Sequence, residues 1–291
     1  MIDKEHKTCL VCGGVKLKPL MKKNGADLLI CGDCRFVFFR QIPTPEELEN
    51  YYKGYGRNDY LSPITIKRYH EILDRFEPYR KNNRLIDVGC GIGYFLEEAK
   101  KRGWEVYGTE YTDKAIAICQ YKGINMSKGA LDPKNYEPGF FDVVTSFEVM
   151  EHINNPREEV KCFNEILRSG GALYITTPNY NSLSRLQLGG DWTVILYPEH
   201  LSYYTPSTLT YLLAGAGFSP VRVETTGISI TRFKRAKKIS DQPLISASSD
   251  DEKLRTAMEG NRWLASLKQG VNGLLTLAGR GDSLKGLYQR N

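Results

Sequence analysis

The sequence predicts an α/β fold in which a mostly parallel sheet carries helices on both faces, preceded by a small cysteine-rich module. Three observations support this prediction. From residue 84 onward, short apolar strands alternate with helical segments, which is the pattern of a parallel sheet built from βα units. A glycine-rich turn follows the first of these strands. Four of the seven cysteines lie within the first 34 residues.

The bulk composition is that of an ordinary globular chain. The 291 residues include 41% hydrophobic and 25% charged residues, enough for one main core and an appended module. The net charge of +6 is compatible with a small anionic substrate, but it does not require nucleic acid as a partner. We find no apolar run of about 20 residues and no apolar signal-peptide core, so we expect a cytoplasmic chain without a membrane span.

Hydrophobic periodicity and turn residues place the individual elements. The expected strands are 84–89, 105–110, 140–149, 172–179, 221–226 and 283–290. The expected helices are 64–80, 94–103, 112–123, 156–171 and 206–217, then one that includes residues 254–267 and a separate one at 271–279. Residues 237–253 are polar and rich in Ser and Asp, which is typical of a linker. We predict a cysteine module at 1–42, a tyrosine-rich connector and helix at 43–83, and a main domain at 84–291.

The cysteine module carries two Cys-x2-Cys pairs separated by eighteen residues, and this spacing is typical of a zinc ribbon. In a reducing compartment such clustering favours metal over disulfides. Four thiolates complete a tetrahedral zinc site and leave no open position, so the expected Zn²⁺ is structural. The four expected ligands are Cys9, Cys12, Cys31 and Cys34.

The glycine-rich turn reads Asp-x-Gly-x-Gly-x-Gly between a strand and a helix. The dinucleotide pattern G-x-G-x-x-G fails here, because Tyr94 and Leu96 occupy the third-glycine positions of the two possible registers. Asp87 can instead meet a cationic amine, and the glycines can pack beside a nucleoside. Glu110 ends the next strand, where a carboxylate can accept hydrogen bonds from both ribose hydroxyls.

These residues closely resemble the class I S-adenosylmethionine-dependent methyltransferases over roughly residues 84–227. The resemblance implies a Rossmann-like sheet with an antiparallel last strand, S-adenosylmethionine as cofactor, and an insertion at 231–279 that caps the acceptor site. It also implies that the fourth strand ends facing cofactor and acceptor. The cofactor-binding positions carried over by the resemblance are Asp87, Gly89, Gly91, Gly93, Glu110, Tyr111, Leu131 and Phe147.

Four residues are candidates for acceptor chemistry. His152 follows the fourth strand, and Tyr197, Glu199 and His200 follow the fifth, so all four lie in carboxyl-end loops. Phenol, carboxylate and imidazole groups can each act as a general base near neutral pH. The open alternative is that the carboxylate and the imidazoles only hold the loops together through hydrogen bonds.

The cysteine quartet, the tyrosine-rich connector and the Tyr-x-Glu-His motif together resemble the zinc-containing sugar C-methyltransferases. That resemblance implies that a connector tyrosine joins the acceptor site, with Tyr52, Tyr55 and Tyr60 as candidates. It also implies a small acceptor such as a sugar, a nucleotide-sugar or a lipid-linked intermediate. The basic run at 232–238 could bind a phosphate group or form a solvated surface.

Two other functions remain open at this point. Some rRNA or tRNA base methyltransferases also join a zinc module to this fold, although the modest charge and the Tyr-x-Glu-His motif favour a small acceptor. A non-enzymatic binding module with a vestigial cofactor site is the second. The sequence does not identify the acceptor atom as oxygen, nitrogen or carbon.

Overall fold

A computed structural model describes residues 5–52, 61–237, 250–259 and 261–291. Its main body is a seven-stranded sheet in the order β10-β11-β8-β7-β4-β5-β6. Only β11 runs antiparallel to its neighbours, as expected for the last strand. These strands are β4 (Arg84–Val88), β5 (Glu105–Glu110), β6 (Asn125–Lys128), β7 (Phe141–Phe147), β8 (Leu167–Pro178), β10 (Phe218–Thr226) and β11 (Ser283–Arg290).

The strand order changes direction at β4. The chain passes from β4 outward to β5 and β6, then returns to place β7 on the other side of β4. In open α/β sheets, ligands bind beside the carboxyl ends of the strands at such a switch point. The loops that follow β4, β5 and β7 are therefore the first place to look for a site.

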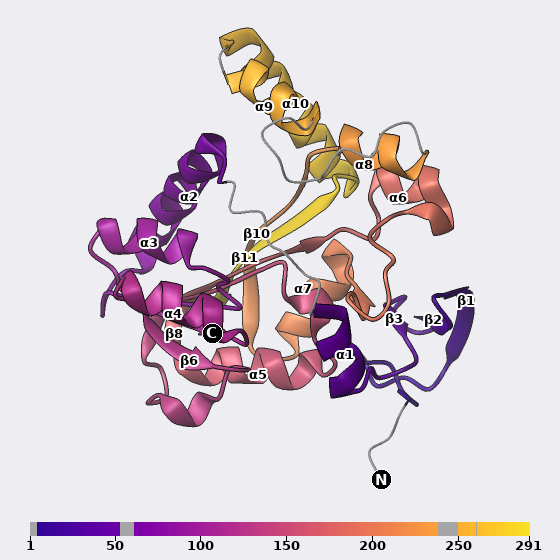
Figure 1. Ribbon diagram of the computed structural model, residues 1–291, viewed down its shortest axis with the longest axis horizontal. Helices are drawn as coiled ribbons and strands as arrows, with labels where there is room; N and C mark the ends of the chain where they lie inside the picture. The colour runs from indigo at the N-terminus through magenta and orange to yellow at the C-terminus, as the bar shows by residue number, and fades with distance from the viewer. Residues whose placement is uncertain (1–4, 53–60, 238–249, 260) are drawn as a thin grey trace.

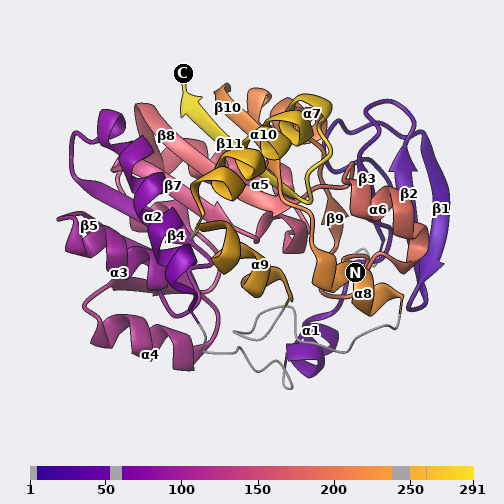
Figure 2. The same cartoon turned by 90° about the horizontal axis from the view of Figure 1, so that it is seen from above.

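Helices cover both faces of this sheet (Figures 1 and 2). The described helices are α1 (Pro45–Tyr52), α2 (Pro63–Phe76), α3 (Tyr94–Lys101), α4 (Asp113–Tyr121), α5 (Pro156–Ile166), α6 (Leu183–Leu188), α7 (Pro206–Ala214), α8 (Ile230–Ala236), α9 (Asp250–Glu259) and α10 (Arg262–Ala278). None of the helices within the described ranges is long and apolar enough to cross a membrane.

Alternating side chains on each central strand fill two separate cores. In β7, Val144 packs with the α5 and α7 side chains, whereas Val143 packs with the α2 and α3 side chains on the opposite face. In β8, Leu173 and Tyr174 divide between the faces in the same way. Successive strand residues point to opposite faces, so a strand buried on both sides reads as a continuous apolar run.

The cysteine module forms a second sheet, in the order β1-β2-β3-β9. Its strands are β1 (Leu17–Lys23), β2 (Ala26–Cys31), β3 (Val37–Phe39) and β9 (Ser202–Tyr203). The sequence analysis expected none of these strands, and it missed β6 as well. Figure 2 shows this sheet at one end of the molecule, with α3 and α4 at the other. Because β9 comes from the main domain, the two sheets are joined through the loop that precedes it.

Two expected helices end clearly earlier in the structure than predicted. The helix expected at 156–171 ends at Ile166, because Leu167 adopts extended backbone angles and pairs with Phe141 at the start of β8. The helix expected at 64–80 ends at Phe76 and is followed by a 3-10 turn, Glu77–Tyr79.

The C-terminal helices are also divided differently from the prediction. Leu254 lies in α9, whereas Leu264 and Leu267 belong to α10, which continues without a break through 271–278. The side chain of Asn261 caps α10 by accepting hydrogen bonds from the Trp263 and Leu264 amides. Most of the linker expected at 237–253 lies outside the described residues, and its last four residues begin α9.

Candidate functional site

The glycine-rich turn between β4 and α3 follows a backbone path that only glycine adopts readily. Gly89, Gly91 and Gly93 have φ angles of +73°, +55° and +74°. A Cβ atom on Gly89 would lie 2.6 Å from Cγ2 of Val149, and one on Gly93 would lie 2.7 Å from Cδ1 of Ile124. The turn therefore lies close to the β7–α5 loop on one side and to the α4–β6 connection on the other.

Two carboxylates flank this turn. Asp87 is 3% exposed, and its Oδ1 accepts a hydrogen bond of 2.8 Å from the Thr145 hydroxyl. Glu110 accepts bonds from the amides of Gly91 (3.1 Å) and Tyr111 (2.8 Å). These bonds fix the Glu110 carboxylate beside the glycine turn. A carboxylate has about four lone-pair sites, so acceptor capacity for ribose hydroxyls remains.

The other three residues expected to contact the cofactor differ from one another in exposure and packing. Tyr111 is 66% exposed, whereas Leu131 is 6% exposed and belongs to the core cluster of the α5 face. The Phe147 ring packs edge-on against Phe95, with 4.9 Å between the ring centroids. The glycines, Asp87 and Glu110 gather around one turn, so the residues present suit a cofactor with an amine and a ribose. The contacts of Tyr111, Leu131 and Phe147 with that cofactor remain predictions.

The turn after β7 brings a second group of polar side chains to the same edge of the sheet. Glu148 has a positive φ of 54°, an uncommon conformation for a residue other than glycine. Its amide donates to the Thr176 carbonyl at 2.9 Å, and a 3-10 turn, Met150–His152, follows. Val149 of this segment is the residue that the glycine turn contacts, so the two groups are neighbours.

His152 and His200 lie against each other, with ring centroids 4.8 Å apart. Nδ1 of His152 is 2.7 Å from the Glu199 carbonyl, and Nδ1 of His200 is 2.9 Å from the Val194 carbonyl. Because a carbonyl oxygen can only accept, Nδ1 carries the proton in both rings, and Nε2 of neutral His200 carries a lone pair. Burial lowers the pKa of His152, and burial followed by the charge of His152 lowers the pKa of His200 to about 4.

Two side chains of the Tyr197–His200 segment contact different parts of the molecule. The Tyr197 ring packs edge-on against Phe39 of the cysteine module, at 5.3 Å between centroids. The Glu199 carboxylate accepts a hydrogen bond of 2.6 Å from the Tyr51 hydroxyl of α1. The connector tyrosine that reaches this segment is thus Tyr51, which the sequence analysis did not name. Tyr55 and Tyr60 lie outside the described residues.

Sequence reasoning also missed two carboxyl groups near the histidines, the buried Glu151 and the exposed Glu148. Glu151 is 2% exposed and accepts a hydrogen bond of 2.9 Å from the Thr177 hydroxyl. Burial, with repulsion from Glu148, raises the pKa of Glu151 well above its usual value. The sequence signal was the Glu-x-x-Glu-His pattern directly after a buried strand. Ligand atoms of Glu151, His152 and His200 lie within 4.8 Å of one another, so this set could also hold a metal ion.

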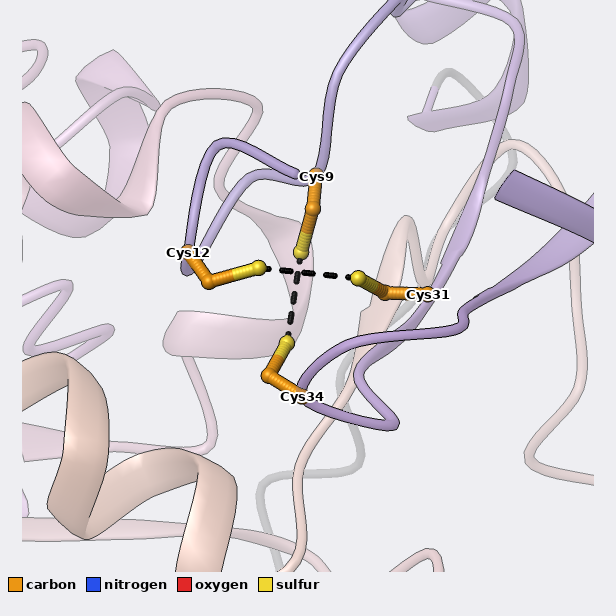
Figure 3. Close-up of side chains that lie close together, drawn as sticks. All are labelled: Cys9, Cys12, Cys31 and Cys34. Atoms are coloured by element: carbon orange, nitrogen blue, oxygen red, sulfur yellow. Dashed lines mark hydrogen bonds between the residues drawn. The ribbon is translucent and has the colours of Figure 1, made fainter. Parts of the chain in front are cut away.

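The four cysteine sulfurs of the module converge on one point (Figure 3). Sγ of Cys9 is 3.5 Å from Sγ of Cys34, and the same distance separates Cys12 from Cys31. Tetrahedral zinc with Zn–S bonds of about 2.3 Å separates its ligand sulfurs by about 3.8 Å. The four side chains come from two turns, one before β1 and one after β2, and they suit a closed structural zinc site.

Direct contacts join the cysteine module to the segment 197–201. β3 pairs with β9, and the Phe39 amide donates to the Leu201 carbonyl at 2.8 Å. The Asn24 side-chain amide donates to the Tyr197 carbonyl at 3.1 Å. On the other side of the module, the Arg157 guanidinium of α5 donates to the carbonyls of Val11 and Cys9. The module therefore holds both flanks of the segment that contains Glu199 and His200.

Comparison with known proteins gives a match over this same region. A family profile described as "Methyltransferase domain" matches residues 61–223, which is more than half of the chain. A ubiquinone biosynthesis O-methyltransferase from Nitrosomonas europaea is 27% identical over 174 residues, covering 54% of this chain and 71% of that protein. The protein of the same name from an Azoarcus species is 28% identical over 151 residues, covering 47% and 65%.

Solved structures share the fold at lower identity. A SAM-dependent methyltransferase from Archaeoglobus fulgidus superposes with a TM-score of 0.53 and 20% identity, over 84% of this chain and 98% of that one. The [4+2]-cyclase SpnF superposes with a TM-score of 0.51 and 15% identity, over 85% and 97%. Since a cyclase shares the fold, the acceptor chemistry has to be argued from the site itself.

Proposed function

Because this chain belongs to the methyltransferase domain family and is an S-adenosylmethionine-dependent methyltransferase, we propose that it methylates a hydroxyl oxygen of a small acceptor, with His200 as the general base. One observation carries the proposal. His200 presents an unprotonated Nε2 in a partly buried cluster, and its neighbour His152 lies on a segment that contacts the glycine turn through Val149. The O-methyltransferase names of two relatives support oxygen as the acceptor atom.

We propose that the glycine turn, Asp87 and Glu110 hold the cofactor, which supplies an electrophilic methyl group on a sulfonium. Asp87 would meet the cationic amine of the cofactor and Glu110 its ribose hydroxyls. Tyr111, Leu131 and Phe147 would complete the pocket around the adenine and the methyl-donor end. The protein then has to orient the acceptor oxygen and remove its proton.

The low pKa of His200 limits the class of hydroxyl that it could deprotonate. A base whose pKa is about 4 is poorly matched to an aliphatic alcohol, and it is better matched to a hydroxyl that is itself acidic. Phenols and enols meet that requirement. We propose that His152 keeps the His200 ring in place, and that the Tyr51–Glu199 pair and Tyr197 position the acceptor beside it.

The zinc-bound cysteine module acts in this proposal as a scaffold. A closed four-thiolate site has no position for substrate. Its contribution would be to fix β3, and through β9 the loop that carries Glu199 and His200. The 231–279 segment would cap the acceptor site.

The first test compares acceptors and variants with labelled S-adenosylmethionine. We expect methyl transfer to phenolic acceptors, with the product identified as a methyl ether by NMR. His200→Gln should lower kcat by about 100-fold or more and leave the Kd for S-adenosylmethionine unchanged. His70→Gln is the matched control, because His70 lies on α2 in an ion pair with Glu98, on another part of the molecule. Tyr51→Phe should raise the acceptor KM more than it lowers kcat.

Three outcomes would contradict this assignment. If His200→Gln kept the wild-type kcat, His200 would not be the general base. Activity lost with EDTA and regained with Mg²⁺ would instead assign Glu151, His152 and His200 to a metal ion. Transfer to carbon of a nucleotide-linked keto sugar, with no phenol methylated, would favour the second candidate, a sugar methyltransferase. The Tyr51–Glu199 contact and the cysteine quartet are the observations that favour that candidate.

A further inference from the structure

The helix α10 packs against the main body with its polar side. The Asn272 side chain accepts a hydrogen bond of 2.9 Å from the Gly227 amide, and the Thr276 hydroxyl accepts one of 3.2 Å from the Thr225 amide. Leu275 is the buried hydrophobic residue on this side. Figure 1 shows α9 and α10 extending away from the body of the molecule. A surface helix normally turns its apolar stripe inward, so α10 is inverted.

The outward side of α10 is apolar along its whole length. The exposed fractions are 86% for Trp263, 64% for Leu267, 69% for Leu274 and 88% for Leu277. Their spacing of four, seven and three residues places them on one stripe of an α-helix. An exposed apolar stripe of this size on a described surface marks an interaction site.

Small residues interrupt this stripe at three positions. Ser266, Gly270 and Gly273 are exposed, and a Cβ atom added at either glycine would have no neighbour within 4 Å. Each glycine inside a helix costs about 1 kcal/mol relative to alanine. Contacts among the described residues do not explain that cost. Small residues on a helix surface allow the backbone of another helix to approach closely.

The large and small residues of the stripe are complementary under one arrangement. Gly270 is the middle residue of α10 (Arg262–Ala278). In an antiparallel pair of helices that cross at Gly270, positions at equal distances on either side of it face each other. The facing pairs are then Trp263 with Leu277, Ser266 with Leu274, Leu267 with Gly273, and Gly270 with itself.

We propose that α10 packs antiparallel against α10 of a second copy of this chain, across a two-fold axis at Gly270. Each leucine of the inner pairs then meets a small residue, and the glycines allow the two helices to cross closely. Such a contact is self-complementary and closed, as a two-fold interface requires. The stripe carries no charged residue, so two copies meet without repulsion between like charges.

A lipid surface fits these observations less well. A helix that lies on a membrane needs a strongly charged face opposite its apolar one. The charged residues of α10 are Arg262 and Lys268, and the side opposite the stripe is hydrogen-bonded to β10. A second copy therefore fits α10 better.

Sedimentation velocity of the full chain tests the proposal. We expect a species of twice the 33.0 kDa chain mass for the wild type, and a monomer for the Leu267→Glu/Leu274→Glu variant. Gly270→Leu should also give a monomer, although its thermal stability should rise because leucine favours the helix and the site is open. Tyr121→Glu is the matched control, because Tyr121 is a 94% exposed aromatic residue on α4. A monomeric wild type at tens of micromolar would overturn the proposal.

Crosslinking with a short bismaleimide tests the register. Gly270→Cys should crosslink to itself, and Ser266→Cys should crosslink to Leu274→Cys when the two proteins are mixed. Leu274→Cys alone should not, because the two copies of residue 274 lie about 12 Å apart along an antiparallel pair. The wild type supplies the background from its own cysteines. Self-crosslinking of Leu274→Cys would indicate a parallel pair, and flotation with anionic vesicles that depends on Leu267 would assign the stripe to lipid. Either result would overturn the proposal.

Discussion

Gly89 combines a conformational and a steric requirement in one residue. Its φ of +73° disfavours any side chain, and its missing Cβ leaves room for Val149. The positions of the cofactor turn and of the Glu148–His152 turn therefore depend on each other. A side chain at Gly89 would disturb both.

Gly89→Ala tests that dependence. We expect the Kd for S-adenosylmethionine to rise at least tenfold, because a Cβ atom 2.6 Å from Val149 must displace one of the two turns. Gly25→Ala, in the turn between β1 and β2, is the control: its φ of +79° imposes similar backbone strain, but nothing lies within 4 Å of the added atom. Calorimetric titration measures both variants. Equal affinities for the two would show that the contact with Val149 has no role.

The partial burial of His200 leads to a prediction about pH. Its pKa is about 4 in the folded protein and about 6.5 in an unfolded chain, so the unfolded chain binds its proton first as the pH falls. The free energy of unfolding should therefore decrease between pH 6.5 and pH 4. Chemical denaturation at several pH values should give a flatter profile for His200→Gln than for the wild type. Parallel profiles would mean that His200 titrates normally.

At the scale of single elements, the cysteine module is held from two directions. β3 pairs with β9 on one side, and α5 reaches the first cysteine turn through Arg157 on the other. The guanidinium contacts the carbonyls of Val11 and Cys9 inside that turn. Arg157 is thus the side chain through which a helix of the main domain holds the proposed zinc site.

Arg157→Gln should loosen the first cysteine turn and leave the sheets intact. We expect zinc to transfer to a colorimetric chelator several-fold faster than from the wild type, with an unchanged circular dichroism spectrum. Arg185→Gln is the control. Arg185 lies in α6, stacks on Tyr180 and does not contact the cysteine turns. Purified protein without zinc would contradict the metal assignment, and equal transfer rates would contradict the role of Arg157.

At the scale of the whole molecule, one core joins the module and the main domain. Cys9, Cys31 and Phe36 of the module belong to the same buried cluster as Phe163 of α5 and Leu209 of α7. A shared core couples the unfolding of the parts that it joins. The module is therefore unlike an independent domain on a linker.

We expect a single unfolding transition in scanning calorimetry, and we expect a chelator to lower its midpoint without splitting it. Zinc that binds only the folded state stabilises the whole cooperative unit. Cys162→Ser, on α5 but outside the quartet, should leave the effect of the chelator unchanged. Two separate transitions, with only the first sensitive to the chelator, would show that the module unfolds on its own.

The sequence by itself determined six of the seven strands of the main sheet, and it predicted the residues proposed to hold the cofactor. Apolar runs, helix periods and glycine turns act over a few neighbouring residues, so a local pattern fixes them. The same local character explains the errors at the helix end near Ile166 and in the division of α9 from α10. At the helix end near Ile166, strand pairing between Leu167 and Phe141 overrides the helical pattern.

The tertiary structure alone decided which distant side chains meet. Tyr51 reaches Glu199 across 148 residues, and His152 meets His200 across α5, β8 and α6. The short strand β9 exists only because β3 lies beside it. No residue pattern within a strand or helix encodes these contacts, since each depends on how two separately formed parts pack. The main sheet and the glycine turn follow from local rules, whereas the proposed acceptor site follows from the joining of the two sheets.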